Sequence, residues 1–115
     1  MIDIRVRAQR GAYVVSLSGV ADAALLGMLL ETVRQLAVED GPVVVDLSDV
    51  TLIAPDAIRS MLESLSSVRD LRVVSTRDTA REILRRCGLD RDSLCTTVEE
   101  AVAIIGRATA SDERA

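Results

Sequence analysis

A chain of 115 residues is long enough for one domain with a modest core, and 49% hydrophobic with 28% charged residues is a globular composition rather than a disordered one. The net charge of −4 does not favour a clustered basic surface, and a single Tyr without any Phe or Trp leaves no stacking platform for bases. Nucleic acid is therefore not an expected partner. The sequence has no His, the commonest general base and metal ligand, and we expect no metal and no cofactor.

The first part of the chain predicts an antiparallel hairpin. Over residues 2–7, Ile and Val alternate with charged residues, which is typical of a strand with one wet face. A turn at residues 9–11 separates this strand from a second one at 13–18. The alternating start does not resemble a signal peptide, and the longest dense apolar stretch, residues 23–30, is about half the length of a membrane span. We therefore expect a cytoplasmic protein without direct membrane insertion.

A long amphipathic helix is expected next, with Asp22 as its N-cap and its end near Val38. Its core stripe consists of Leu26, Leu29, Leu30, Val33 and Ala37. Further apolar side chains widen this stripe beyond what one core face needs: Leu25, Met28 and Leu36. The excess predicts either a deeply buried helix or a contact surface, such as the interface of a weak homodimer.

The run VVVDL at residues 43–47 is almost continuously apolar, which is typical of a central strand covered on both faces. Asp46, near the end of this run, is the exception. A carboxylate in that environment needs backbone partners or water. Its role is therefore either a structural hydrogen bond or a contact with a partner.

The stretch APDA at residues 54–57 joins this strand to a second amphipathic helix. Pro55 suits the first helical position, because the N–H that proline lacks would have no partner there. Asp56 then lies in the first turn, where the helix dipole favours its negative charge by roughly 0.3–1 kcal/mol. This alone explains Asp56 as a helix-start residue. The polar face of the same helix carries Arg59, Ser60, Glu63 and Ser64.

The rest of the chain continues to alternate strands and helices. Residues 71–75 predict a strand, and Gly88 is expected just beyond the end of a third helix. A short strand at 94–96 is followed by a capping box at 97–100, which begins a final helix that stops at Gly106.

The resulting order is β-β-α-β-α-β-α-(β)-α. It predicts an α/β fold with a mixed, mostly parallel sheet of four to five strands, an N-terminal hairpin and about four helices. We expect one domain over residues 1–106 and a flexible polar tail over residues 107–115.

Several stretches, in this order, resemble a STAS domain, and the bacterial anti-sigma factor antagonists in particular. They are GVAD before the first long helix, VVVDLSDVTLI before the corner, and CGLD followed by TVEEAVA near the end. The resemblance covers residues 2–106 and implies a mixed sheet with helices. It also implies a non-enzymatic regulator of a sigma factor, and so of transcription, that binds an anti-sigma factor of the serine-kinase (GHKL) type.

The corner departs from the family's pattern. The family usually has Asp-Ser-Ser-Gly there, and the partner kinase phosphorylates the second serine. In this chain Ala54 stands at the aspartate, Pro55 at the first serine, Asp56 at the phosphorylated serine and Ala57 at the glycine. Asp56 has no hydroxyl to phosphorylate, and its charge of about −1 compares with −1.5 to −2 for phosphoserine. It is thus either a weak mimic of the phosphorylated state or the mark of a variant without the switch.

The leading hypothesis is a binding module that docks its partner through the Asp56 corner and the polar face of the second helix. Asp22 and Asp46 match two other acids that are frequent in the family. The alternative is a STAS subunit of a membrane lipid-transport complex, or a stress-signalling scaffold. For the leading hypothesis, we expect partner contacts through Asp22, Asp46, Ala54, Pro55, Asp56, Ala57, Arg59, Ser60, Glu63 and Ser64.

An enzyme is the least expected class. The sequence shows no Gly-rich phosphate loop and no nucleophile paired with a base. Cys87 and Cys95 are too few and too far apart for a zinc site, and we expect two buried thiols rather than a disulfide.

Overall fold

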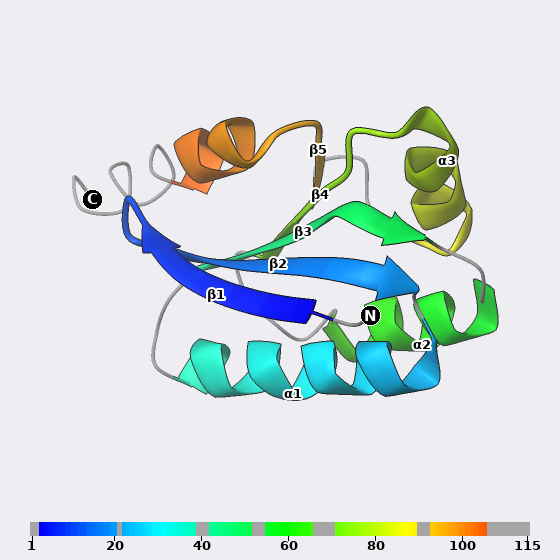
Figure 1. Cartoon of the computed structure of the whole chain (residues 1–115). Helices are drawn as coiled ribbons and strands as arrows, with labels where there is room; N and C mark the ends of the chain where they lie inside the picture. Colours follow the sequence, from blue (N-terminus) through cyan, green and yellow to red (C-terminus); the bar gives the residue numbers. More distant parts are fainter. Residues whose placement is uncertain are drawn as a thin grey trace.

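The computed structural model describes residues 3–20, 22–38, 42–51, 55–65, 71–89 and 93–105. These residues form a five-stranded sheet with helices on both faces (Figure 1). In chain order the elements are β1 (Asp3–Gln9), β2 (Ala12–Val20), α1 (Ala23–Val38), β3 (Val43–Thr51), α2 (Pro55–Leu65), β4 (Leu71–Val74), α3 (Asp78–Arg86), β5 (Leu94–Cys95) and a final helix over residues 98–105.

The strands lie side by side in the order β1-β2-β3-β4-β5. β1 and β2 are antiparallel, and the other three neighbouring pairs are parallel. Arg10 and Gly11 make the hairpin turn with φ angles of 52° and 82°. Two consecutive residues in the left-handed region are typical of the tight turns whose twist matches that of the flanking strands. The predicted hairpin and the mostly parallel sheet are confirmed.

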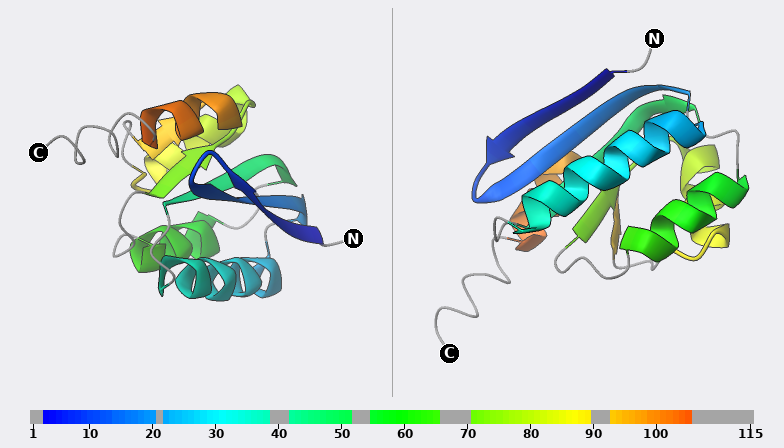
Figure 2. Two further views of the ribbon diagram at one scale, coloured as in Figure 1. Left: turned by 90° about the vertical axis from the view of Figure 1, so that its left-hand side faces the viewer. Right: turned by 90° about the horizontal axis from the view of Figure 1, so that it is seen from below.

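Two hydrophobic clusters hold the layers together, one on each face of the sheet. In the first, Leu29 of α1 and Ile58 of α2 pack on Val45 of β3. In the second, Val102 of the final helix packs with Val44 of β3. Figure 2 shows α1 and α2 on one side of the sheet and the final helix on the other. Alternate residues of β3 therefore enter two different cores, which explains its almost continuous apolar run.

Most helix ends lie where the sequence predicts them. Gly88, with a φ of 108°, follows Cys87, the C-cap of α3. The N–H of Glu100 donates to Thr97 Oγ1 (3.1 Å), as in the predicted capping box. In the reciprocal bond, Glu100 Oε2 accepts from the N–H of Thr96 (3.4 Å), one residue before the N–H that a capping box usually uses. The predicted end at Gly106 lies outside the described residues.

The wide apolar stripe of α1 is only partly buried. Leu25 is fully buried, Leu36 is partly buried against the first cluster, and Met28 is 52% exposed. Both cysteines are buried and free, as predicted. In the part of the chain that the structure describes, no helix combines the length and the apolar character needed to cross a membrane.

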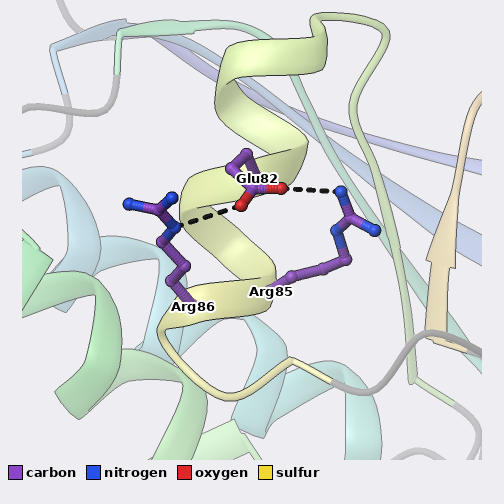
Figure 3. A network of polar contacts seen from close by, with 3 residues as sticks. All are labelled: Glu82, Arg85 and Arg86. Carbon is purple, nitrogen blue, oxygen red and sulfur yellow. Dashed lines mark hydrogen bonds and ion pairs between the residues drawn. The ribbon is translucent and has the colours of Figure 1, made fainter.

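A small ion-pair network lies on the outer surface of α3 (Figure 3). Glu82 accepts hydrogen bonds from Arg85 Nη2 (2.7 Å) and Arg86 Nε (3.1 Å), which lie three and four positions further along the helix, about one turn away. The hydrogen bond from Arg86, followed by the charge of Arg85, lowers the pKa of the Glu82 carboxyl below its ordinary value. Because all three side chains are well exposed, solvent screens most of this interaction.

We predict a small, directional pH effect from Glu82. Its pKa is lower in the folded chain than in the unfolded one, so its stabilising contribution is present above the unfolded pKa and is lost as the pH falls from about 4.5 through the folded pKa. In urea titrations over this range, Glu82→Gln should lose less stability on acidification than wild type. Glu99→Gln, on an exposed position of the final helix, is the control and should behave as wild type. Equal acid sensitivity of all three proteins would contradict the prediction.

Candidate functional site

The candidate site lies at the edge of the sheet where β2 and β3 end. Val20 and Thr51, the last residues of these two strands, are paired in a parallel register. The carboxyl ends of parallel strands meet at one edge, and α1 and α2 therefore begin there (Figure 1). This places the Asp22 and Asp56 corners at the same edge, as the sequence predicts.

Asp22 caps α1. Its Oδ1 accepts a hydrogen bond from the N–H of Leu25 (2.8 Å), and its backbone carbonyl accepts from the N–H of Leu26 (3.0 Å). The predicted N-cap is confirmed. The capping bond uses one carboxylate oxygen of an exposed side chain, and the other oxygen remains available at the surface.

α2 begins at Pro55, in agreement with the sequence prediction, and Asp56 and Ala57 follow in its first turn. The side chain of Asp56 is exposed. Its charge lies beside the unpaired N–H groups and positive dipole end that every helix start presents. Ala54, the remaining residue of the corner, lies outside the described residues.

A shallow groove of about 290 Å³ runs between α1 and α2. The two helices lie side by side in the views of Figure 2. From α2, Ser60, Met61 and Ser64 line the groove, and from α1 it is lined by Ala23, Leu26, Gly27 and Leu30. Arg59 and Glu63 are exposed on α2 outside the residues that line the groove. The structure thus brings Ser60 and Ser64 together with an apolar wall that the sequence analysis did not assign to the site.

The sequence assigned the apolar wall of the groove to the core. Leu26 and Leu30, which line the groove, belong to the predicted core stripe of α1. The residues that widen this stripe do not line the groove: Leu25 is buried, Leu36 is partly buried and Met28 is exposed. Which α1 residues border the groove depends on how α1 packs on α2, and a helical periodicity does not contain that information.

Asp46 lies apart from this site. The sequence interpretation that it stands near the end of its strand is wrong, because β3 continues to Thr51. Its neighbours Val45 and Leu47 enter the cluster under α1 and α2, so alternation points the Asp46 side chain to the opposite face of the sheet. There Asp46 Oδ1 accepts from the N–H of Ser48 (3.0 Å), where the β2–β3 register shifts. This local bond helps β3 to continue past the irregularity.

The chemistry available at the α1–α2 edge is that of a docking surface. Exposed Asp56 and Arg59 offer charges of both signs, and Ser60 borders a groove with an apolar wall. Such a mixture suits ion pairs and hydrogen bonds around an apolar contact, the usual composition of a protein–protein interface.

The comparisons with known proteins agree with this geometry. A family model described as "Mlab, STAS domain" matches residues 4–99. Among solved structures, an anti-sigma factor antagonist from Mycobacterium paratuberculosis is 26% identical, with 90% of this chain and 93% of that chain covered and a TM-score of 0.72. No curated protein matches the sequence.

Two structures of SpoIIAA share the fold at lower identity. The anti-sigma factor antagonist SpoIIAA in its unphosphorylated form is 14% identical, with 90% of this chain and 96% of that chain covered and a TM-score of 0.66. The Bacillus cell fate determinant SpoIIAA in the phosphorylated form is also 14% identical, with 90% and 99% covered and a TM-score of 0.62.

We predict that Asp22→Ala destabilises the protein by about 1 kcal/mol, because the N–H of Leu25 loses its acceptor. Asp22→Asn keeps an acceptor oxygen and should retain most of this stability. Arg77 is the matched control, since it occupies the N-cap position of α3 without a side-chain capping bond, and Arg77→Ala should change little. Urea denaturation measures all three variants; equal losses for Asp22→Ala and Arg77→Ala would contradict the capping role.

Proposed function

The chain belongs to the STAS domain family, and from this we propose that it is a regulatory, non-enzymatic module that docks an anti-sigma factor of the serine-kinase (GHKL) type through the beginning and polar face of α2. The observation that carries the proposal is the exposed carboxylate of Asp56 in the first turn of α2. The resemblance aligns this residue with the family's phosphorylated serine. The likeness to an anti-sigma factor antagonist over 90% of the chain supports the same class of partner.

Asp56 acts in this proposal as a built-in, weaker equivalent of a phosphate. A carboxylate carries about one negative charge and two acceptor oxygens, whereas phosphoserine carries up to two charges and three acceptors. In the family, phosphorylation releases the antagonist from its kinase. A permanent negative charge at the same place therefore holds this protein in a state that binds its partner weakly.

The docking surface combines the beginnings of two helices. Its corner consists of Asp22 at the start of α1 and of Pro55, Asp56 and Ala57 at the start of α2. Ala54, which precedes Pro55 in the sequence, is proposed as part of the same corner. Arg59, Ser60, Glu63 and Ser64 extend it along α2 beside the groove. Asp46 is not included, because its side chain lies on the other face of the sheet.

A second candidate function is a subunit of a lipid-transport complex or of a signalling scaffold. It is favoured by the half-exposed Met28 and by Leu30 at the groove, which leave part of α1 apolar and open to a partner or to a second copy in a weak homodimer. The identity of the captured partner distinguishes the two functions.

The first test compares wild type, Asp56→Ser and Asp56→Asn as baits for partners in lysate of the native cells, with identification by mass spectrometry. Asp56→Asn removes the charge without creating a phosphorylation site, and we expect it to capture a kinase-type anti-sigma factor about tenfold more strongly than wild type. Asp56→Ser should do the same in the absence of ATP. Asp78→Asn is the matched control, because Asp78 is also an exposed acid in the first turn of a helix, α3.

Equal capture of such an anti-sigma factor by all baits would show that Asp56 is only a helix-start residue. Capture of a transporter component instead would favour the second candidate function.

The extent of the surface is tested with the double charge reversal Arg59→Glu with Glu63→Arg. Both changes together leave the net charge unaltered, so a loss of capture reports on the surface itself. We expect the affinity for the anti-sigma partner to fall at least tenfold in binding titrations with the purified pair. The same reversal of Glu82 and Arg86, also four positions apart on α3, is the control and should bind as wild type. An unaltered affinity of the α2 variant would exclude α2 as the docking helix.

A further inference from the structure

A polar hollow lies on the face of the sheet opposite α1 and α2. It has a volume of about 660 Å³ and is built by three neighbouring strands. The charged and hydroxyl side chains at it are Asp3, Arg5 and Arg7 from β1, Ser16 and Ser18 from β2, and Asp46 and Asp49 from β3. The docking surface proposed above does not include these residues, and the inference below does not depend on that proposal.

The hollow begins where the cover of the final helix stops. Val14 and Val44 are a parallel pair under the final helix. The next positions on the same face are the pair Ser16 and Asp46. No residue of the final helix lines the hollow. From one residue pair to the next on this face, the surface thus changes from apolar side chains packed under the final helix to hydroxyl and carboxylate side chains that line the hollow.

Unpaired charges of opposite sign lie at different places in the hollow. On the β1 side, Arg5 Nε is paired with Asp3 Oδ2 (2.9 Å), and Arg7 makes no hydrogen bond or ion pair within the described part of the chain. On the β3 side, Asp46 uses one oxygen for the N–H of Ser48, and Asp49 has no partner among the described residues. In the strand register, Arg7 is level with Val14 and Val44, and Asp49 is level with Ser18 and Asp3. The unpaired cation therefore lies at one end of the hollow, and Asp49 lies at the other end.

Arg7 and Asp49 are too far apart to pair directly. Two strand spacings of about 4.8 Å across the sheet and four residues of about 3.3 Å along it separate their backbones by about 16 Å. The hydroxyls of Ser16 and Ser18 lie between the two sides, and neither makes a hydrogen bond in the described part of the chain. Within that part, no three acidic or thiol side chains are grouped so as to hold a metal ion.

We propose that the polar hollow binds a small zwitterion that carries a guanidinium at one end and a carboxylate at the other, the chemistry of free arginine. The guanidinium donates to Asp49 and to the free oxygen of Asp46, because a planar fork of N–H groups fits carboxylate acceptors. The ligand carboxylate accepts from Arg7. The serine hydroxyl oxygens accept from the remaining donors of the ligand, its Nε–H and its α-ammonium group.

The complete chain is titrated with L-arginine, agmatine and citrulline by calorimetry to test this proposal. Agmatine lacks the carboxylate of arginine, and citrulline replaces its guanidinium with a neutral urea group. Arginine should bind at least tenfold more tightly than either analogue, because each analogue leaves one side of the hollow without its charged partner. This series uses only the wild-type protein and is therefore independent of any effect of substitution on folding.

Two substitutions assign the two ends of the ligand. Arg7→Gln should remove the preference for arginine over agmatine, and Asp49→Asn should remove most of the preference for arginine over citrulline. Arg34→Gln on α1 and Asp78→Asn on α3 are exposed controls of the same chemistry, and both preferences should survive in them. The proposal is overturned if arginine does not bind at millimolar concentration, if agmatine or citrulline binds as tightly, or if the preferences persist in the hollow variants.

Discussion

β3 is buried between α1 and α2 on one face of the sheet and the final helix on the other, and the rest of the structure depends on this constraint. Val43, Val45 and Leu47 are packed under α1 and α2, and Val44 is packed under the final helix. A parallel strand in the middle of a sheet needs both covers, because its backbone pairs on both sides and its side chains point both ways. The positions of α1, α2 and the final helix all follow from this requirement.

The same constraint explains why the two candidate sites are separate. Past Val44 the second face of β3 is polar, so no helix is needed there and the hollow with Asp46 and Asp49 stays open. On the first face, β3 remains apolar through Val50, and α1 and α2 can meet over it. One strand therefore provides a covered face that leads to the proposed docking edge and an open face that contributes to the polar hollow.

Local patterns were sufficient to predict the elements and their caps. Asp22, Pro55 and Gly88 are each explained by the conformation of one helix end, and such conformations depend on neighbouring residues alone. The structure of β3 was predicted less well, because its register shift depends on how β2 pairs with it. The groove between α1 and α2 and the grouping of Arg7 with Asp49 could not be read from the sequence, since both join residues 30 or more positions apart through tertiary packing.

β1 differs from the other long strands in what holds it. It has one neighbour, β2, and of its side chains only Ile4 packs against a hydrophobic cluster, from a partly buried position. A segment with so little buried surface opens locally at a much lower free energy than the global unfolding of the domain. Its backbone amides will exchange with solvent hydrogen well before those of β3, and detachment of this one strand leaves the two hydrophobic clusters almost intact. The sheet therefore consists of a rigid inner part and a separately labile outer strand, which carries the cationic side of the polar hollow.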